Sequence, residues 1–451
     1  MKKKIMTAVL ITAMAVSMLA GCSQGKSSVD VNGGKQVKVE EGGKKQQGAS
    51  GNEKITLKMF SNLPDRKGGQ GLVEQMIIDE YMKENSNVAI EVEALDDEAY
   101  KTIFKAYAMN GMPDIVSIWG QPSFLNEVLD AGVLAELKEE DYTEYKFISG
   151  SLEGFKKDGK LYGLPRNSDI MGFYYNQKLF DDNGWSVPDT YEEFLKLCKT
   201  IKAEGYAPIA MDGGDGWPLA IYLHDLLLKV AGNDTAELVN AAIAKGDFSG
   251  ETFKKAAQLL QDSAAAGMFQ TGYDSQDYGT AMNLFTNGQA AMFYMGSWEA
   301  AMALNEDIDP EIRNNIKAFT MPTVAGGKGS KTDIMAWNGG GYAVAADSNY
   351  KEEAVKFLNY MYQPDKLSRY GWENGVGMSA QNQSEYMSGK ETKLQLQWMD
   401  LLNGATSVSG TPLNDCGPSI FKTVVESEIQ SLSNGTKSVE EFLKSIGEAC
   451  K

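Results

Sequence analysis

The stretch ITLKMFSNLPDRKGGQGLVEQMIIDEY, residues 55–81, decides the fold class. Its first residues alternate, with apolar Ile55, Leu57 and Met59 separated by polar neighbours, which is typical of a strand with one buried face. A polar, glycine-rich turn follows, and apolar residues then recur at helical spacing as far as Tyr81. The stretch therefore predicts a strand, a loop and a helix.

The alternation of strands and helices continues along the chain. Residues 88–92 alternate as a second strand, residues 99–110 have a helical pattern, and residues 114–118 are typical of a buried strand. Further on, Thr190 and Glu193 form a capping box that predicts the start of a helix. This order predicts an α/β fold in which helices cover a mostly parallel sheet.

The first fifty residues predict export and lipid attachment. Three lysines precede the uncharged residues 5–20, a run too short for a stable membrane span and typical of a secretory signal. The run ends in Leu19-Ala20-Gly21-Cys22, which resembles the bacterial lipoprotein box, and this resemblance implies a lipidated Cys22. Few large apolar side chains follow. We therefore expect a signal peptide at 1–21 and a lipidated, flexible tether at 22–51.

Composition excludes several classes of function. A chain of 451 residues is long enough for two or more lobes without disulfides or metals. Its 61 acidic residues against 43 basic ones argue against nucleic acid as a partner. The single histidine, His224, rules out a multi-histidine zinc site, and its apolar surroundings predict a hydrogen-bonded core residue. We expect no metal and no cofactor.

Three cysteines follow the tether. Cys198 lies on the apolar face of a predicted helix, which favours a buried, inert thiol. Cys416 and Cys450 remain a candidate disulfide pair, although their spacing gives it no support. We expect no catalytic role for any of them.

Four motifs occur in a fixed order between about residue 55 and the C-terminus. They are Met112-Pro113-Asp114-Ile115-Val116; Tyr162-Gly163-Leu164-Pro165 with Gly172-Phe173-Tyr174-Tyr175-Asn176 and Pro188-Asp189-Thr190-Tyr191-Glu192-Glu193-Phe194; Phe285-Thr286-Asn287-Gly288-Gln289-Ala290-Ala291-Met292 with Gly296-Ser297-Trp298; and Gly339-Gly340-Gly341-Tyr342-Ala343-Val344. In this order the chain resembles the extracellular solute-binding proteins of ABC importers, family 1, which bind carbohydrates and include maltose-binding protein.

The resemblance implies a two-lobed periplasmic-binding-protein-like fold of type II, with a sugar held between lobes that a multi-crossing hinge joins. We expect residues 52–167 and 321–370 in lobe 1, and residues 168–320 and 371–451 in lobe 2. The resemblance further implies a monomer that is not an enzyme. A lipid would anchor it to the extracellular face of the membrane of a Gram-positive-type cell, where it would deliver a di- or oligosaccharide to ABC permease subunits.

Sugar recognition favours flat aromatic platforms for C–H faces and planar carboxylates or amides for hydroxyls. Five tryptophans lie in loops or at element ends beside polar residues or glycine, which favours a ligand face over a core; they are Trp119, Trp217, Trp298, Trp337 and Trp372. By the resemblance, Trp298 matches a stacking tryptophan and Trp217 an aromatic segment of the cleft. Trp398 has core spacing, and Trp185 is expected at the surface or in packing.

Polar candidates come from two arguments. Asn62 and Gln121 follow strands whose carboxyl ends should meet at the ligand crevice of an α/β sheet. The resemblance places Asp169 where an acidic sugar ligand stands, although a lone aspartate is more often a cap. Asp215 belongs to a segment that departs from the maltose-binding pattern, so maltodextrin is not implied. Gly340 predicts close approach of the backbone to a ligand, or a hinge.

Three other functions stay open at this point. An exported glycoside hydrolase would use similar tryptophan platforms together with a pair of carboxylates. A binding protein for a non-sugar solute is the second, and an adhesion or structural lipoprotein without a small ligand is the third.

Overall fold

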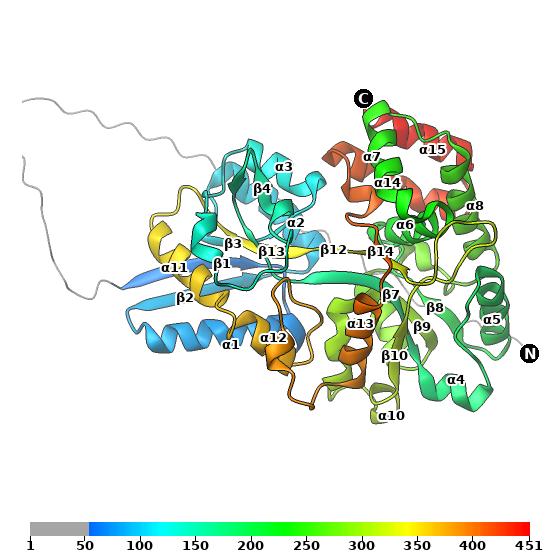
Figure 1. Cartoon of the computed structure of the whole chain (residues 1–451), viewed down its shortest axis with the longest axis horizontal. Helices are drawn as coiled ribbons and strands as arrows, with labels where there is room; N and C mark the ends of the chain where they lie inside the picture. The colour runs from blue at the N-terminus through cyan, green and yellow to red at the C-terminus, as the bar shows by residue number, and fades with distance from the viewer. Residues whose placement is uncertain (1–53) are drawn as a thin grey trace, which may run out of the picture. The chain divides into compact units, whose positions relative to one another are not determined.

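Two mixed sheets organise the part of the chain that the structure describes, residues 54–451 of a computed structural model (Figure 1). The expected signal peptide, the lipidated Cys22 and the tether lie outside the described residues. Helices pack against both sheets, which confirms the predicted α/β class. We call the elements around the first sheet lobe 1 and those around the second sheet lobe 2.

The first sheet has the strand order β2-β1-β3-β13-β6. Strand β1 pairs in parallel with β2 and β3, whereas β13 runs antiparallel to both β3 and β6. The strands and helices expected between residues 55 and 118 are confirmed. The strands are β1 (Ile55–Ser61), β2 (Val88–Ala94), β3 (Ile115–Trp119), β6 (Leu164–Pro165) and β13 (Gly340–Val344).

The second sheet has the order β10-β7-β9-β8, and β12 also pairs with β7. β8 pairs in parallel with β9, and β7 runs antiparallel to its neighbours β9, β10 and β12, so β8, β9, β10 and β12 point the same way and the sheet is mostly parallel, as predicted, with β7 reversed. β7 is reversed because the chain enters this sheet along it as a hinge strand rather than through a helical crossover. The strands are β7 (Ser168–Asn176), β8 (Ala207–Ala210), β9 (Ala290–Gly296), β10 (Ile316–Phe319) and β12 (Ala336–Asn338).

Helices cover both sheets, and α5 begins with the predicted capping box of Thr190 and Glu193. Among the described residues, no helix combines the length and the apolar character needed to cross a bilayer. In lobe 1 the helices are α1 (Gly69–Glu84), α2 (Asp97–Asn110), α3 (Pro122–Asp130), α11 (Lys351–Met361) and α12 (Leu367–Glu373). In lobe 2 they are α4 (Gln177–Asn183), α5 (Tyr191–Ala203), α6 (Trp217–Ala231), α7 (Thr235–Lys245), α8 (Glu251–Ala265), α9 (Tyr278–Thr286), α10 (Pro310–Arg313), α13 (Lys393–Asn403), α14 (Ser419–Ser433) and α15 (Val439–Glu448).

Three chain segments cross between the sheets side by side. The amide N–H of Arg166, between β6 and β7, donates to the carbonyl of Gly340 at 2.7 Å. The N–H of Ser168 donates to the carbonyl of Met378 at 3.0 Å, on the opposite side. The first crossing therefore lies between the other two, and the multi-crossing hinge is confirmed.

The second and third crossings lie later in the chain than expected. Met321, Val324 and Met335 pack in the core of lobe 2, so the chain returns to lobe 1 only near Gly340, not at residue 321. Leu367 and Val376 belong to the core of lobe 1, so the chain leaves it after residue 376 rather than at 371. In both cases the apolar residues before the crossing pack in the core of the lobe that the chain is about to leave, and this packing delays the crossing.

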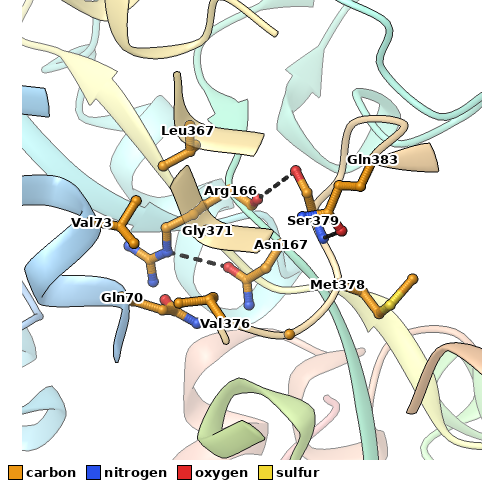
Figure 2. A pocket seen from close by; sticks show the side chains of 11 residues that line it. Gln70, Val73, Arg166, Asn167, Leu367, Gly371, Val376, Met378, Ser379 and Gln383 are labelled. Atoms are coloured by element: carbon orange, nitrogen blue, oxygen red, sulfur yellow. Dashed lines mark hydrogen bonds between the residues drawn. The ribbon is translucent and has the colours of Figure 1, made fainter. Parts of the chain in front are cut away.

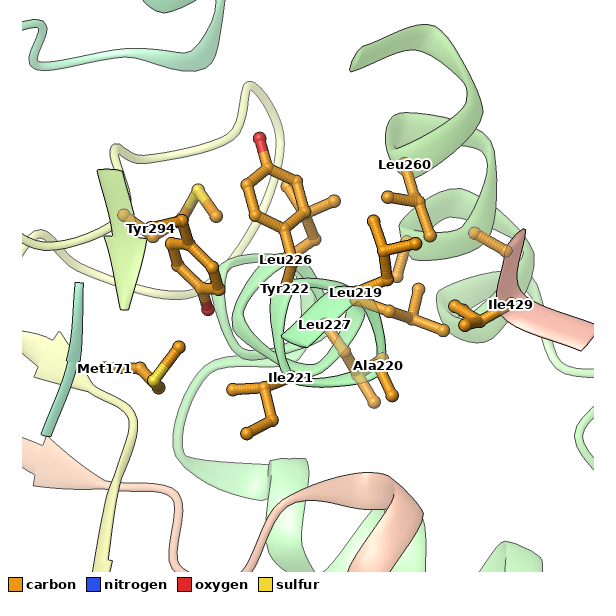
Figure 3. Packing of buried hydrophobic residues seen from close by; sticks show 14 of the residues in the cluster. Met171, Leu219, Ala220, Ile221, Tyr222, Leu226, Leu227, Leu260, Tyr294 and Ile429 are labelled. Carbon is orange, nitrogen blue, oxygen red and sulfur yellow. The ribbon is translucent and has the colours of Figure 1, made fainter. Parts of the chain in front are cut away.

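Helix α6 is the centre of the lobe 2 core, because nearly all its side chains are buried. Figure 3 shows its residues directed toward Leu260 of α8, Ile429 of α14 and Tyr294 of β9. His224 lies on this helix and is fully buried, as predicted, and burial lowers its pKa to about 4. Neither ring nitrogen has a hydrogen-bond partner, so the expected hydrogen bonding is wrong. The helix is enclosed on every side, mostly by apolar side chains.

The three described cysteines are free thiols. Cys198 is fully buried in the lobe 2 core, which confirms its predicted role. The candidate pair of Cys416 and Cys450 is not formed. Each thiol instead donates to a backbone carbonyl, that of Thr411 at 3.2 Å and that of Ile446 at 3.4 Å, respectively.

Candidate functional site

Four aromatic rings gather at element ends in lobe 2, and we call them the aromatic cluster. Trp217 begins α6, Tyr278 begins α9, Trp298 follows β9 in a 3-10 segment (Ser297–Leu304), and Trp337 lies in β12. The ring of Trp298 lies 6.1 Å from those of Trp217 and Trp337, and Trp217 lies 6.3 Å from Tyr278. All four remain partly exposed. Three predicted tryptophans thus meet on one surface.

Hydrogen bonds fix the orientation of the central rings. The indole Nε1 of Trp298 donates to the Tyr278 hydroxyl at 2.8 Å, and that hydroxyl donates in turn to Oε1 of Glu299. Burial raises the pKa of Glu299, while the Tyr278 hydrogen bond lowers it. The chain of bonds links the edge of the Trp298 ring to a carboxylate and leaves the ring faces free of these bonds; an aromatic face and a carboxylate are the two group types that sugar recognition favours.

Asp169 is buried at the edge of the aromatic cluster. It pairs with Trp337 across the β7–β12 ladder, and its Oδ1 accepts from the Asn167 amide. Burial raises the pKa of Asp169 to about 7, against the lowering effects of the Asn167 hydrogen bond and of Arg166. A Cβ at Gly339 would lie only 1.7 Å from Asp169 Oδ2, so a side chain at this position would displace the Asp169 carboxylate. Asp169 is not a helix cap.

Lobe 1 contributes the predicted Asn62 and Trp119. The amide of Asn62 donates to Oδ1 of Asp97 at 2.8 Å, and its backbone N–H donates to the Ser117 hydroxyl at 3.3 Å. The ring of Trp119 packs edge-on, at 5.5 Å, against Tyr100. Both residues are partly exposed at the carboxyl ends of parallel strands, as the sheet rule predicts.

Carboxylates of the two lobes face a common space. Asp97 of lobe 1 raises the pKa of Asp169, and Glu98 of lobe 1 raises that of Asp215 in lobe 2. The predicted Gln121 is buried at the start of α3, and its Oε1 has no hydrogen-bond partner. Carboxylates of lobe 1 thus lie near two predicted acidic residues of lobe 2, Asp169 and Asp215.

A polar contact joins the lobes directly, and we call it the clasp. The Ser123 hydroxyl of α3 donates to Oδ1 of Asp415 at 2.6 Å. The Lys422 ammonium on α14 donates to Asp415 at 2.8 Å and to Glu426 at 2.5 Å. These two carboxylates raise the pKa of Lys422 against the lowering effect of burial. The clasp holds α3 against α14.

Two predicted residues lie away from the aromatic cluster. Trp372 is buried, donates from Nε1 to Glu391 at 3.1 Å, and lines a groove of about 570 Å³ beside Phe147 and Met399. Gly340 pairs with Trp119, and a Cβ there would lie 2.8 Å from a guanidinium nitrogen of Arg166. Of its two expected roles, its surroundings favour the hinge.

A small pocket lies beside the hinge, and Figure 2 shows Arg166 and Asn167 within it. The Arg166 Nε donates to the side-chain oxygen of Asn167 at 3.2 Å. The pocket has a volume of about 20 Å³, which is enough for a water molecule but not for a sugar ring. We therefore assign this pocket to the hinge and not to the ligand site.

Sequence reasoning missed several members of the site. Tyr278 has a sequence signal, since it follows Asp277, whose side chain caps α9. Glu299 adjoins a predicted residue, but nothing in the sequence shows that a tyrosine orients it. Ser123, Asp415 and Lys422 are far apart in sequence and carry no motif, so only the packing of α3 on α14 reveals the clasp. Trp398 is fully buried, and Trp185 packs partly buried against the lobe 2 core, as predicted.

Comparison with known proteins identifies relatives of similar length. The multiple sugar-binding protein of Streptococcus mutans serotype c is 27% identical over 330 residues, which cover 70% of this chain and 73% of that protein. The melibiose/raffinose/stachyose-binding protein of Bacillus subtilis is 23% identical over 368 residues, covering 79% and 77%.

A solved structure from work on xylan utilization by the thermophilic bacterium Caldanaerobius polysaccharolyticus has the same fold. It superposes with a TM-score of 0.80 at 29% identity, and the match covers 87% of this chain and 99% of that one. The profile of the family described as bacterial extracellular solute-binding protein matches residues 67–366. The chain belongs to the bacterial extracellular solute-binding protein family.

Proposed function

We propose that the protein captures a di- or oligosaccharide between its two lobes and delivers it to the permease of an ABC importer. The observation that carries this proposal is the aromatic cluster. Its rings offer flat faces to the C–H groups of a sugar, and Glu299 and Asp169 stand beside them as acceptors for hydroxyls. The names of the relatives support a sugar as the ligand.

Closure of the lobes fits this function. A ligand shifts a hinge equilibrium only by the contacts that differ between the open and closed states. Asn62 and Trp119 of lobe 1 and the aromatic cluster of lobe 2 give a bound sugar partners on both sides. The permease then recognises the closed form through the outer faces of the lobes.

We propose that a lipid on Cys22 holds the protein at the extracellular face of the membrane. The extracellular location fits the family, and the motif around Cys22 is the support for the anchor. Cys22→Ala tests it directly. The variant should lose incorporation of labelled palmitate and appear in the medium, whereas continued labelling would contradict the anchor.

A thermal-shift screen tests the sugar proposal. A ligand at a hundred times its dissociation constant stabilises the folded protein by about 2.7 kcal/mol. Di- and oligosaccharides should raise Tm, and amino acids and short peptides should leave it unchanged. Chromatography of the sugar after incubation should show it intact. Cleavage products would instead identify a hydrolase.

A further inference from the structure

The loop before α6 brings the carboxyl groups of Asp212 and Asp215 close enough to share a hydrogen bond. Asp212 is fully buried, and its Oδ2 has no hydrogen-bond partner, while its Oδ1 accepts from the N–H of Asp215 at 3.2 Å. Asp215 is partly exposed, two residues before Trp217 of the aromatic cluster. Burying an ionised carboxylate costs free energy when one of its oxygens accepts no hydrogen bond. A shared proton, donated by Asp212 to Asp215, removes that cost.

The loop is held rigidly from two sides. The N–H of Gly214 donates to the Gln276 carbonyl at 2.9 Å, and the Gln430 amide of α14 donates to the carbonyls of Gly213 and Gly214. A Cβ at Gly216, whose φ is +78°, would lie 2.4 Å from the Glu426 carbonyl oxygen. The backbone that carries Asp215 is therefore held in place by the fold.

The charges that face the pair are mostly negative. Burial raises the pKa of Asp215, the Asp212 hydrogen bond lowers it, and the charges of Glu98 from α2 and Asp277 from the start of α9 raise it further. Burial and the Asp215 charge hold the pKa of Asp212 well above its usual range. Asp215 is thus the ionised partner.

The nearby cations do not offset this charge. The Lys101 ammonium donates to Glu98 at 2.6 Å, and the Lys422 ammonium is bonded to the two carboxylates of the clasp. Arg166 donates to the Tyr342 hydroxyl and lowers the pKa of Asp169, which nevertheless stays raised. A ligand therefore meets an excess of carboxylates in this part of the site.

We infer that Asp215 accepts hydroxyl hydrogen bonds from the ligand, that Asp212 is its positioning residue, and that the pair makes the site selective for oligosaccharides without a carboxylate. This inference rests on the proposed sugar-binding function. A neutral sugar donates its hydroxyl hydrogens to Asp215. A uronate places a second anion beside Asp215, where the nearby cations of the described chain, Lys101, Lys422 and Arg166, are already bonded to other groups.

Calorimetry with matched sugar pairs tests the inference. The probes are xylotriose with its glucuronyl-substituted form, and cellobiose with cellobiouronic acid. At pH 7.5 the wild-type protein should bind the uronate of a pair at least tenfold more weakly than the neutral sugar. In Asp215→Asn the two dissociation constants should agree within about threefold. Asp234→Asn, which removes the same charge from an exposed ion pair with Lys328, should keep the wild-type ratio.

Two variants at position 212 test the positioning role. Asp212→Leu removes the donor and should weaken binding of the neutral sugar about tenfold, and Asp212→Asn, which keeps an N–H donor, should recover most of that loss. Between pH 7 and pH 10 the affinity should fall in the wild type, as Asp212 loses its proton, and stay flat in Asp212→Asn. If the wild type bound the neutral sugar and the uronate of a pair equally well, or if Asp215→Asn kept the wild-type ratio of the two affinities, the inference would be wrong while the proposed function would stand. Failure of every sugar to bind would overturn the proposed function as well.

Discussion

The indole Nε1 of Trp298 donates to the Tyr278 hydroxyl at 2.8 Å, and the bond fixes the central ring of the aromatic cluster. Trp298 enters the site from the end of β9, and Tyr278 enters it from the start of α9. The packing of these two elements therefore sets the orientation of the Trp298 ring before any ligand binds. A preformed surface loses less entropy when it binds.

Trp298→Ala should weaken sugar binding by about 1–3 kcal/mol, because it removes a stacking face from a partly buried site. Tyr278→Phe keeps the ring and removes only the hydroxyl that orients Trp298, so it should cause a smaller loss. Calorimetry with a sugar that binds the wild type measures both. Wild-type affinity in a folded Trp298→Ala variant would place this ring outside the binding surface.

Ser123→Ala should open the ligand-free protein. The Ser123–Asp415 bond joins the lobes, and a hydrogen bond to a charged group contributes about 1.5–3 kcal/mol. Its loss favours the open state, so the radius of gyration from small-angle X-ray scattering should rise and apparent sugar affinity should fall several-fold. Ser427→Ala, which removes an exposed hydroxyl from α14, is the matched control and should scatter like the wild type. Identical curves for the two variants would show that the clasp does not hold the lobes.

Asp169 should make stability decrease as pH rises. Its pKa is about 7 in the folded protein and about 3.9 in an unfolded chain, so folding takes up a proton between these values. The favourable contribution is complete below pH 4 and is lost as pH rises through 7. Asp169→Asn should therefore lose less Tm than the wild type between pH 5 and pH 8. Asp182→Asn changes an exposed carboxylate and should keep the wild-type slope. Parallel Tm profiles for Asp169→Asn and the wild type would contradict the raised pKa.

His224 should have the opposite effect on pH dependence. Its folded pKa of about 4 lies below the unfolded value of about 6.5, so the unfolded chain binds the extra proton and stability falls as pH drops from 6.5 to 4. His224→Leu also removes two buried nitrogens that have no partner. The variant should melt above the wild type, and by a larger margin at pH 5 than at pH 8. A lower Tm at both pH values would mean that the imidazole packs better than leucine.

Local patterns in the sequence were sufficient to predict most strands and helices and three rings of the aromatic cluster. Alternation predicted β1, and the capping box predicted the start of α5, because both signals depend on neighbouring residues. The polar and glycine neighbours of Trp217, Trp298 and Trp337 predicted that these tryptophans lie in loops or at element ends, because a core tryptophan usually has apolar neighbours.

The remaining features depend on contacts between distant segments. The antiparallel pairs of the second sheet follow from the hinge path of β7, and the late crossings follow from where apolar residues such as Val324 and Val376 find their core. Trp372 also lies beside polar residues, yet the packing of α12 buries it in the wall of a separate groove. Sequence spacing does not encode which of two sheets a distant segment packs against.

Sugar capture is tested by isothermal titration calorimetry of the protein with a panel of neutral di- and oligosaccharides, alongside amino acids and short peptides. We expect saturable binding of at least one sugar at one site per chain, with the affinity reduced in Trp298→Ala. No heat with any sugar, together with saturable binding of an amino acid or a peptide, would contradict it.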